Sequence, residues 1–228
     1  MTKRRQPLGQ SIGGVLFGFE QQVFRNVPPP HELAHHARPD AAVPAGDGSM
    51  VTLTLPSDDD QGEGGQPMTE MAFRELQPQT TVAVRLRMPR AEADMAKLFG
   101  QYLPKVGAWL AGSGAQPSGA PFGRYHEWNA DTADVEIGIP VTSPPPGAPR
   151  LSDVEPGEIG TSELPGGLAG VAVHVGAYEE LPATYDALHE WIHAQGREEG
   201  RGPWESYIDD PEGMDQATVR TEVIWPVP

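Results

Sequence analysis

An internal repeat limits the fold of this chain more than any other feature of its sequence. Five residues of a first segment have counterparts 82 residues later: Trp109, Leu110, Gly114, Pro121 and Tyr125 precede Trp191, Ile192, Gly196, Pro203 and Tyr207. Ile139-Pro140-Val141 is echoed by Trp225-Pro226-Val227 at a slightly different offset. Repetition at a fixed spacing indicates two structural copies of one unit. We therefore expect two similar halves related by a pseudo-two-fold axis.

The hydrophobic pattern predicts the same order of elements in both copies, namely strand, helix, strand and strand. In the first copy, strands are expected at 80–88, 122–128 and 135–141, with a helix at 91–110. In the second, strands are expected at 168–175, 204–209 and 218–227, with a helix at 179–195. A loop is expected at about 143–158. The predicted fold class is α+β, with tandem β-α-β-β repeats, an antiparallel sheet and a central ligand cleft between the halves.

Residues 1–66 differ from the rest of the chain. They contain Pro28-Pro29-Pro30, a histidine-rich stretch and an acidic tract, Asp58-Asp59-Asp60. The alternating run Val51–Leu55 predicts one short strand, and the remainder is typical of loop. We expect an N-terminal extension over 1–66 and one domain over 67–228, with halves at about 67–142 and 160–228.

Charge and cysteine content exclude several classes of function. The formal net charge is −16, so a phosphate backbone is repelled and direct binding to nucleic acid is not expected. The chain has no cysteine, which excludes thiol catalysis, disulfides and thiolate metal ligands. No apolar run reaches the length of a bilayer span, so we expect a cytoplasmic protein without membrane contact. A monomer is taken as the default state.

The segment Gly202–Tyr207 holds the strongest candidate site. In a strand, Glu205 and Tyr207 share one face while Trp204 shares the other with Ser206. The repeat places Gly123 at the position of Glu205, so the two halves supply one carboxylate. A carboxylate among aromatic side chains attracts lipophilic cations, whose rings stack on the aromatics. In the alternative reading, Glu205 lies on a solvated strand face and the aromatic residues are core.

Other motifs give no metal or cofactor site. His31-Glu32-Leu33-Ala34-His35 has the spacing of a zinc-protease motif, but three prolines precede it and no long amphipathic helix surrounds it. The chain has no phosphate-binding loop and no dinucleotide fingerprint. His174 is expected to be a hydrogen-bonded core residue. Neither His174 nor His189 has an acidic partner at nearby spacing.

Several motifs together resemble one known family. In the second half they are Leu164–Gly167, Val171–Gly176 with Tyr178, Trp204–Tyr207, and Asp210-Pro211; in the first half they are Arg124–Trp128 and Asp134–Val141. On these residues, 70–228 resembles the GyrI-like small-molecule-binding domain, which is also the effector-binding domain of multidrug-sensing transcription regulators. The resemblance implies a cleft that binds bulky, often cationic aromatic compounds against a glutamate on a late strand.

The resemblance also implies roles for individual residues. Glu205 occupies the position of that glutamate, with Tyr207 and Tyr125 as neighbours. The wall of the cleft is expected to include Trp128, Glu136, Phe99 and Trp225. The chain departs from the regulators in having no recognisable DNA-binding domain, and residues 1–66 lie outside the shared region.

Three functions are consistent with these observations. The first is a stand-alone protein that binds lipophilic, cationic aromatic molecules, as in multidrug or xenobiotic binding. The second is a hydrolase, because some stand-alone family members open the cyclopropane ring of DNA-alkylating natural products. There Glu205 would be the general base, and Tyr207 or Tyr125 would protonate or hydrogen-bond the substrate oxygen that gains charge. The third is a ligand-sensing component that acts on a separate transcription regulator.

Overall fold

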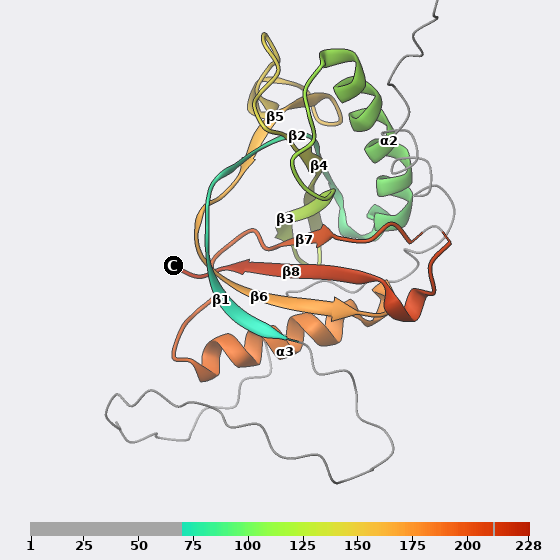
Figure 1. Cartoon of the computed structure of the whole chain (residues 1–228). Helices are drawn as coiled ribbons and strands as arrows, with labels where there is room; N and C mark the ends of the chain where they lie inside the picture. Colours follow the sequence, from blue (N-terminus) through green and yellow to red (C-terminus); the bar gives the residue numbers. More distant parts are fainter. Residues whose placement is uncertain (1–69, 212) are drawn as a thin grey trace, which may run out of the picture.

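The computed structural model describes residues 70–211 and 213–228. These residues form one eight-stranded sheet and two α-helices (Figure 1). The expected extension, including the strand at Val51–Leu55 and the motif at His31–His35, lies outside the described residues.

The elements follow one another in an order that repeats. The strands and helices are β1 (Met71–Leu76), β2 (Gln79–Pro89), α2 (Met95–Ser113), β3 (Phe122–Trp128), β4 (Thr132–Pro140), β5 (Ile159–Leu164), β6 (Gly167–Val175), α3 (Leu181–Ala194), β7 (Trp204–Tyr207) and β8 (Arg220–Pro226). Short 3-10 turns lie at Arg90–Glu92, Leu151–Asp153, Tyr178–Glu180 and Gln216–Thr218. The predicted α+β class and the repeated β-α-β-β core are confirmed.

The sheet is antiparallel, and its strand order is β1-β6-β8-β7-β3-β4-β2-β5. The strands β6, β8 and β7 come from the second copy, and β3, β4 and β2 come from the first. The copies meet where β3 pairs with β7, and there Gly123 lies opposite Glu205. Because the repeat relates these two residues to each other, the pseudo-two-fold axis passes between them.

Each half has one strand more than the sequence predicts. Two residues, Gln77-Pro78, connect β1 to β2, yet β1 pairs with β6 of the other half (Figure 1). Likewise Pro165-Gly166 connects β5 to β6, yet β5 pairs with β2. Each half therefore adds an edge strand to its partner half, and the exchange ties the two halves together.

The two connections cross closely at Gly166. A Cβ atom at this position would lie 2.5 Å from Pro78 Cδ and 2.9 Å from the Leu76 carbonyl oxygen. Only glycine fits there without displacing the other connection.

Local signals set the limits of the helices. Asp94 caps α2 by accepting a hydrogen bond from the Lys97 amide, so the helix starts after the predicted residue 91. Gly114, with φ of 75°, ends it in the left-handed conformation. Pro182 lies in the first turn of α3, where no amide donor is needed.

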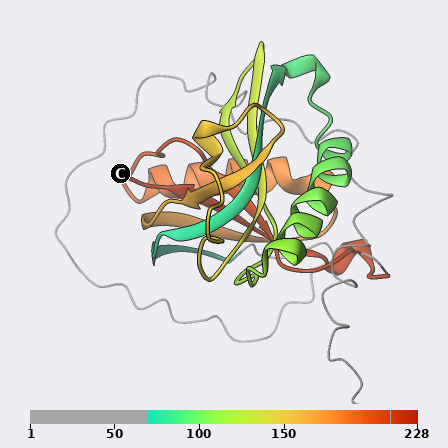
Figure 2. The same cartoon turned by 90° about the horizontal axis from the view of Figure 1, so that it is seen from above.

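Both helices cover the same face of the sheet. α2 packs on β2 and β4, and α3 packs on β6, as Figure 2 shows from above. Their buried side chains join those of the strands in one large core, which includes Phe99, Tyr125, Tyr185, Tyr207 and Trp225. A smaller cluster, including Phe122 and Trp204, lies on the other face. The predicted separation of Trp204 from Tyr207 is therefore confirmed.

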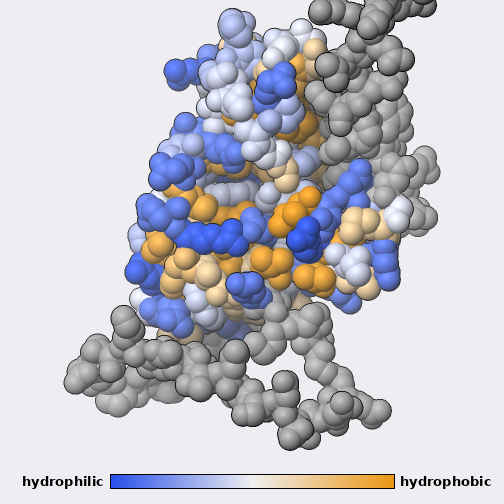
Figure 3. Space-filling view, in the orientation of Figure 1, coloured by the Kyte–Doolittle hydropathy of each residue, from blue (hydrophilic) through white to orange (hydrophobic). Residues whose placement is uncertain are grey.

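The surface in the orientation of Figure 3 intersperses hydrophobic residues with hydrophilic ones. Neither helix of the described region is both long and apolar enough to cross a membrane.

We expect Gly166→Ala to lower the free energy of unfolding by about 1–3 kcal/mol, because the added methyl group overpacks the crossing. Urea unfolding would measure the loss. The matched control is Gly112→Ala on the exposed side of α2, where a Cβ atom meets nothing within 4 Å. This control is expected to be neutral or stabilising, since alanine favours helix. Equal effects of the two substitutions would contradict the role assigned to the crossing.

Candidate small-molecule site

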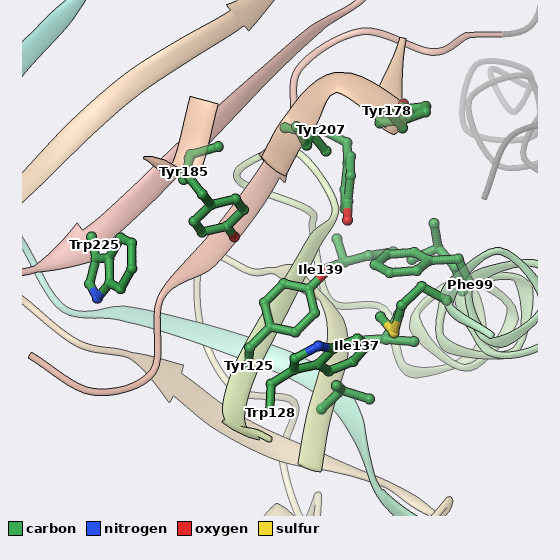
Figure 4. Packing of buried hydrophobic residues seen from close by; sticks show 14 of the residues in the cluster. Phe99, Tyr125, Trp128, Ile137, Ile139, Tyr178, Tyr185, Tyr207 and Trp225 are labelled. Carbon is green, nitrogen blue, oxygen red and sulfur yellow. The ribbon is translucent and has the colours of Figure 1, made fainter. Parts of the chain in front are cut away.

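The carboxylate of Glu205 lies at the centre of a buried tyrosine cluster. Glu205 is 2% exposed. Its Oε2 accepts hydrogen bonds from the hydroxyls of Tyr207 at 2.5 Å and Tyr125 at 3.2 Å, and its Oε1 accepts one from Tyr185 at 3.1 Å. The three rings point their hydroxyl groups toward a common centre (Figure 4). The alternative reading is wrong in placing Glu205 on a solvated strand face, but its other part is confirmed, because the aromatic residues belong to the core.

The cluster follows the pseudo-symmetry of the fold. Tyr125 and Tyr207 are equivalent in the repeat, and both donate to the same oxygen of Glu205. The equivalent of Glu205 is Gly123, where a Cβ atom would lie 2.7 Å from Phe99 Cζ and 3.3 Å from Tyr207 Oη. Aromatic side chains thus occupy the space that a side chain at residue 123 would need. The site therefore holds one carboxylate, that of Glu205.

Burial dominates the electrostatics of this cluster. Burial raises the pKa of Glu205, and the hydrogen bonds from Tyr207, Tyr185 and Tyr125 partly oppose that rise. The pKa values of the three tyrosines also rise, first through burial and then through the nearby carboxylate. Among residues 70–211 and 213–228, no basic side chain forms an ion pair with Glu205. Neutral phenols alone therefore bind the carboxylate in the described structure.

A second layer of aromatic residues surrounds the tyrosines. The Phe99 ring lies 5.0 Å from that of Tyr207, edge to face, and Trp128 and Trp225 make similar contacts with Tyr125 at 5.2 Å and Tyr185 at 5.7 Å. Figure 4 shows these rings around the cluster. The structure thus places Phe99, Trp128 and Trp225 beside the tyrosines, and their role in the wall of a ligand cleft stays a prediction.

Glu136 does not belong to this cluster. Its neighbours on β4, Val135 and Ile137, face the main core, so Glu136 points to the other side of the sheet. There its Oε2 lies 2.8 Å from His126 Nε2, and it lines a different cavity of about 500 Å³ with Arg85. The expectation that Glu136 lines the same wall is therefore wrong.

Sequence reasoning missed Tyr185 altogether and gave Tyr178 no role. Tyr185 is on the buried face of α3 with Leu181 and Leu188, and a buried phenol needs an acceptor. This requirement could have indicated that Tyr185 has a buried polar partner, and in the structure that acceptor is Glu205. Tyr178 packs edge to face on Tyr207, with ring centroids 5.7 Å apart.

The histidines of the second half differ from each other. His174 is buried, and its ring nitrogens contact Thr184 Oγ1 at 2.8 Å and the Ala177 carbonyl oxygen at 2.9 Å. The prediction of a hydrogen-bonded core histidine is confirmed. His189 forms an ion pair with Glu199, an acidic partner ten residues along the chain, where nearby spacing gives no signal.

The structure is a duplicated α+β domain with one buried carboxylate among aromatic rings, where its halves meet. The model of the GyrI-like small molecule binding domain matches residues 69–228. The chain therefore belongs to the GyrI-like family, and the resemblance noted in the sequence is confirmed.

Solved structures share this fold. The C-terminal domain of EcmrR is 25% identical, with a TM-score of 0.58, and the match covers 71% of this chain and 99% of that one. EcmrR in a complex with DNA is 23% identical, with a TM-score of 0.55 and coverage of 70% and 57%. A hydrolase from Listeria innocua is 15% identical, with a TM-score of 0.50 and coverage of 72% and 94%. A comparison with curated proteins found no match.

We expect the stability gained by Glu205→Gln, relative to the wild type, to grow as the pH rises above 4.5, the ordinary pKa of the group. The folded protein holds this pKa above the unfolded value. Ionisation at higher pH therefore costs folding free energy in the wild type and none in the variant. Urea unfolding between pH 4.5 and 8 would measure the difference.

Glu92→Gln, which removes an exposed carboxylate, is the control for the loss of one charge. A difference between Glu205→Gln and the wild type that is independent of pH would contradict the assignment.

Proposed function

We propose that this chain binds lipophilic, cationic aromatic small molecules against Glu205. The observation that carries the proposal is a buried carboxylate held only by tyrosine hydroxyls in the described structure. A buried anion without a cationic partner favours any ligand that supplies the positive charge. The surrounding rings offer π-faces to such a cation and apolar area to its aromatic groups.

The aromatic cluster also affects how a ligand enters. Because Glu205 is 2% exposed, the side chains that cover it must move before a ligand can contact the carboxylate. Binding that depends on such a rearrangement is slower than diffusion-limited association. In the described structure, Tyr125, Tyr185 and Tyr207 hold the carboxylate in place from three different elements.

The similarity to the EcmrR C-terminal domain supports a ligand-sensing role, in which binding at Glu205 would be signalled to a partner. A net charge of −16 opposes contact with DNA, so the partner in such a role would be another protein. Sequestering of toxic cations needs no partner and uses the same site.

One observation favours hydrolysis as a second candidate function. Glu205 has a raised pKa and a 2.5 Å hydrogen bond to Tyr207, so the pair can accept and donate a proton. Glu205 would take a proton from water while the water oxygen bonds to a cyclopropane carbon. The ring bond would break toward a conjugated carbonyl, whose oxygen would receive a proton from Tyr207. Glu205 would then pass the proton taken from water to Tyr207, which restores both groups.

A tryptophan-quenching titration would test the binding proposal, with a cationic rhodamine ester compared with a neutral xanthene dye of similar shape. Glu205→Gln is expected to weaken cation binding by at least about tenfold, equivalent to about 1.4 kcal/mol, and to leave the neutral dye within about twofold. Glu136→Gln, a buried carboxyl on the opposite face, is the matched control and should change neither affinity. Equal weakening of both dyes would overturn the electrostatic part of the proposal.

Incubation with an electrophilic cyclopropane compound separates binding from hydrolysis. If the site only binds, mass spectrometry will find no more water adduct than in buffer. Repeated turnover that disappears in Glu205→Gln and in Tyr207→Phe would establish the hydrolase instead.

A further inference from the structure

A second cluster of side chains lies near the end of α3, apart from the tyrosines. His189 and His193 are four residues apart, so they lie on one side of the helix. Glu199 lies beyond the helix and folds back onto both. Its Oε2 is 3.0 Å from His193 Nε2, and its Oε1 forms an ion pair with His189 Nδ1. One potential ligand atom from each residue lies within 4.8 Å of the other two.

The residue types match a divalent-cation site. Two imidazoles and one carboxylate form an open set of three ligands, which leaves a fourth position for water. Histidines at positions i and i+4 of a helix are spaced for joint coordination of one ion. His193 has a side chain that is 48% exposed, so the open position would face solvent.

The carboxylate of Glu199 has a buried oxygen that a bound cation would satisfy. Its Oε1 is buried, yet it has no hydrogen bond of acceptable geometry, although His189 is within ion-pair distance. A buried acceptor without a hydrogen bond costs free energy unless some other positive group satisfies it. A cation between Glu199 and the two histidines would do so.

The backbone around Glu199 holds this residue in position. Gly196, with φ of 71°, turns the chain at the end of α3. The Gly200 amide then donates a hydrogen bond to the Pro226 carbonyl oxygen at 2.7 Å, and Trp225 Nε1 donates one to the Gly200 carbonyl oxygen at 3.1 Å. The residue next to Glu199 is thus fixed to β8, and a site built on fixed elements needs little reorganisation to bind its ion.

From these observations we propose that His189, His193 and Glu199 bind a divalent cation of the Zn²⁺ class. The ion would link the last turn of α3 to the segment that leads into β7. Sequence reasoning predicts no metal site here, because Glu199 is ten residues beyond His189 and only the turn at Gly196 brings the two together. The proposal does not depend on the ligand of Glu205.

Titration of the full chain with Zn²⁺ against a chromophoric chelator would test the proposal. We expect the wild type to bind Zn²⁺ at this site and His193→Gln or Glu199→Gln to lose at least about tenfold in affinity. Loss of an outer-shell partner typically lowers metal affinity by about 10- to 100-fold, so loss of a direct ligand should lower the affinity for Zn²⁺ at least as much. Far-ultraviolet circular dichroism would check that the variants fold, which is expected because His193 is exposed.

Two control variants separate this cluster from the other histidines. His126→Gln removes the partner of Glu136, another contact between a histidine and a carboxylate, and should leave Zn²⁺ affinity unchanged. Replacing His31, His35 and His36 together by Gln should leave one Zn²⁺ site intact. A second readout is thermal unfolding, because an ion that binds the folded state alone raises the midpoint. Zn²⁺ should raise it in the wild type and both controls, and much less in His193→Gln.

Three results would overturn the proposal. They are no Zn²⁺ binding by the wild type, unchanged affinity in both His193→Gln and Glu199→Gln, and loss of binding only in the triple substitution at 31, 35 and 36. Visible absorption of the Co²⁺-loaded protein gives a further check. Bands of a four-coordinate ion should appear in the wild type and should be absent from Glu199→Gln.

Discussion

The pairing of β3 with β7 sets the position of nearly every feature of the site. Three residue pairs join the two halves there, and Gly123 faces Glu205 at the middle of the three. A shift of one residue in this register would turn Glu205 to the face of Trp204, away from the helices. The contact that joins the halves into one sheet therefore also determines where the carboxylate lies.

Burial of Glu205 links the stability of the fold to its chemistry. The carboxylate loses its hydration, and three phenols from β3, β7 and α3 replace the lost water only in part. Tyr185 is the contribution of α3, so the packing of this helix and the state of the carboxylate are coupled. A better-solvated glutamate would cost less free energy, but it would attract a lipophilic cation less strongly.

The sequence predicts the parts of this structure that depend on local pattern. The repeat, both helices and the alternation that separates Glu205 from Trp204 are all local. β1 and β5 were missed because each pairs with the half to which it is not connected. Glu136 was misplaced because β4 is buried on both faces, which removes the alternation that shows which side a residue takes. The partners Tyr185 and Glu199 were missed because their contacts depend on tertiary packing.

The repeat also affects how a ligand is oriented. Tyr125 and Tyr207 are equivalent in the repeat and donate to one oxygen of Glu205, which gives the site a single charge close to the axis. Under the proposed function, a flat cation with its charge at the centre could be turned over about this axis and keep its contacts with both tyrosines and its ion pair. Two equivalent poses contribute about 0.4 kcal/mol of orientational entropy. If the proposed cation binds here, one charged at one end has a single pose, so the pair of equivalent tyrosines would favour cations whose charge lies at their centre.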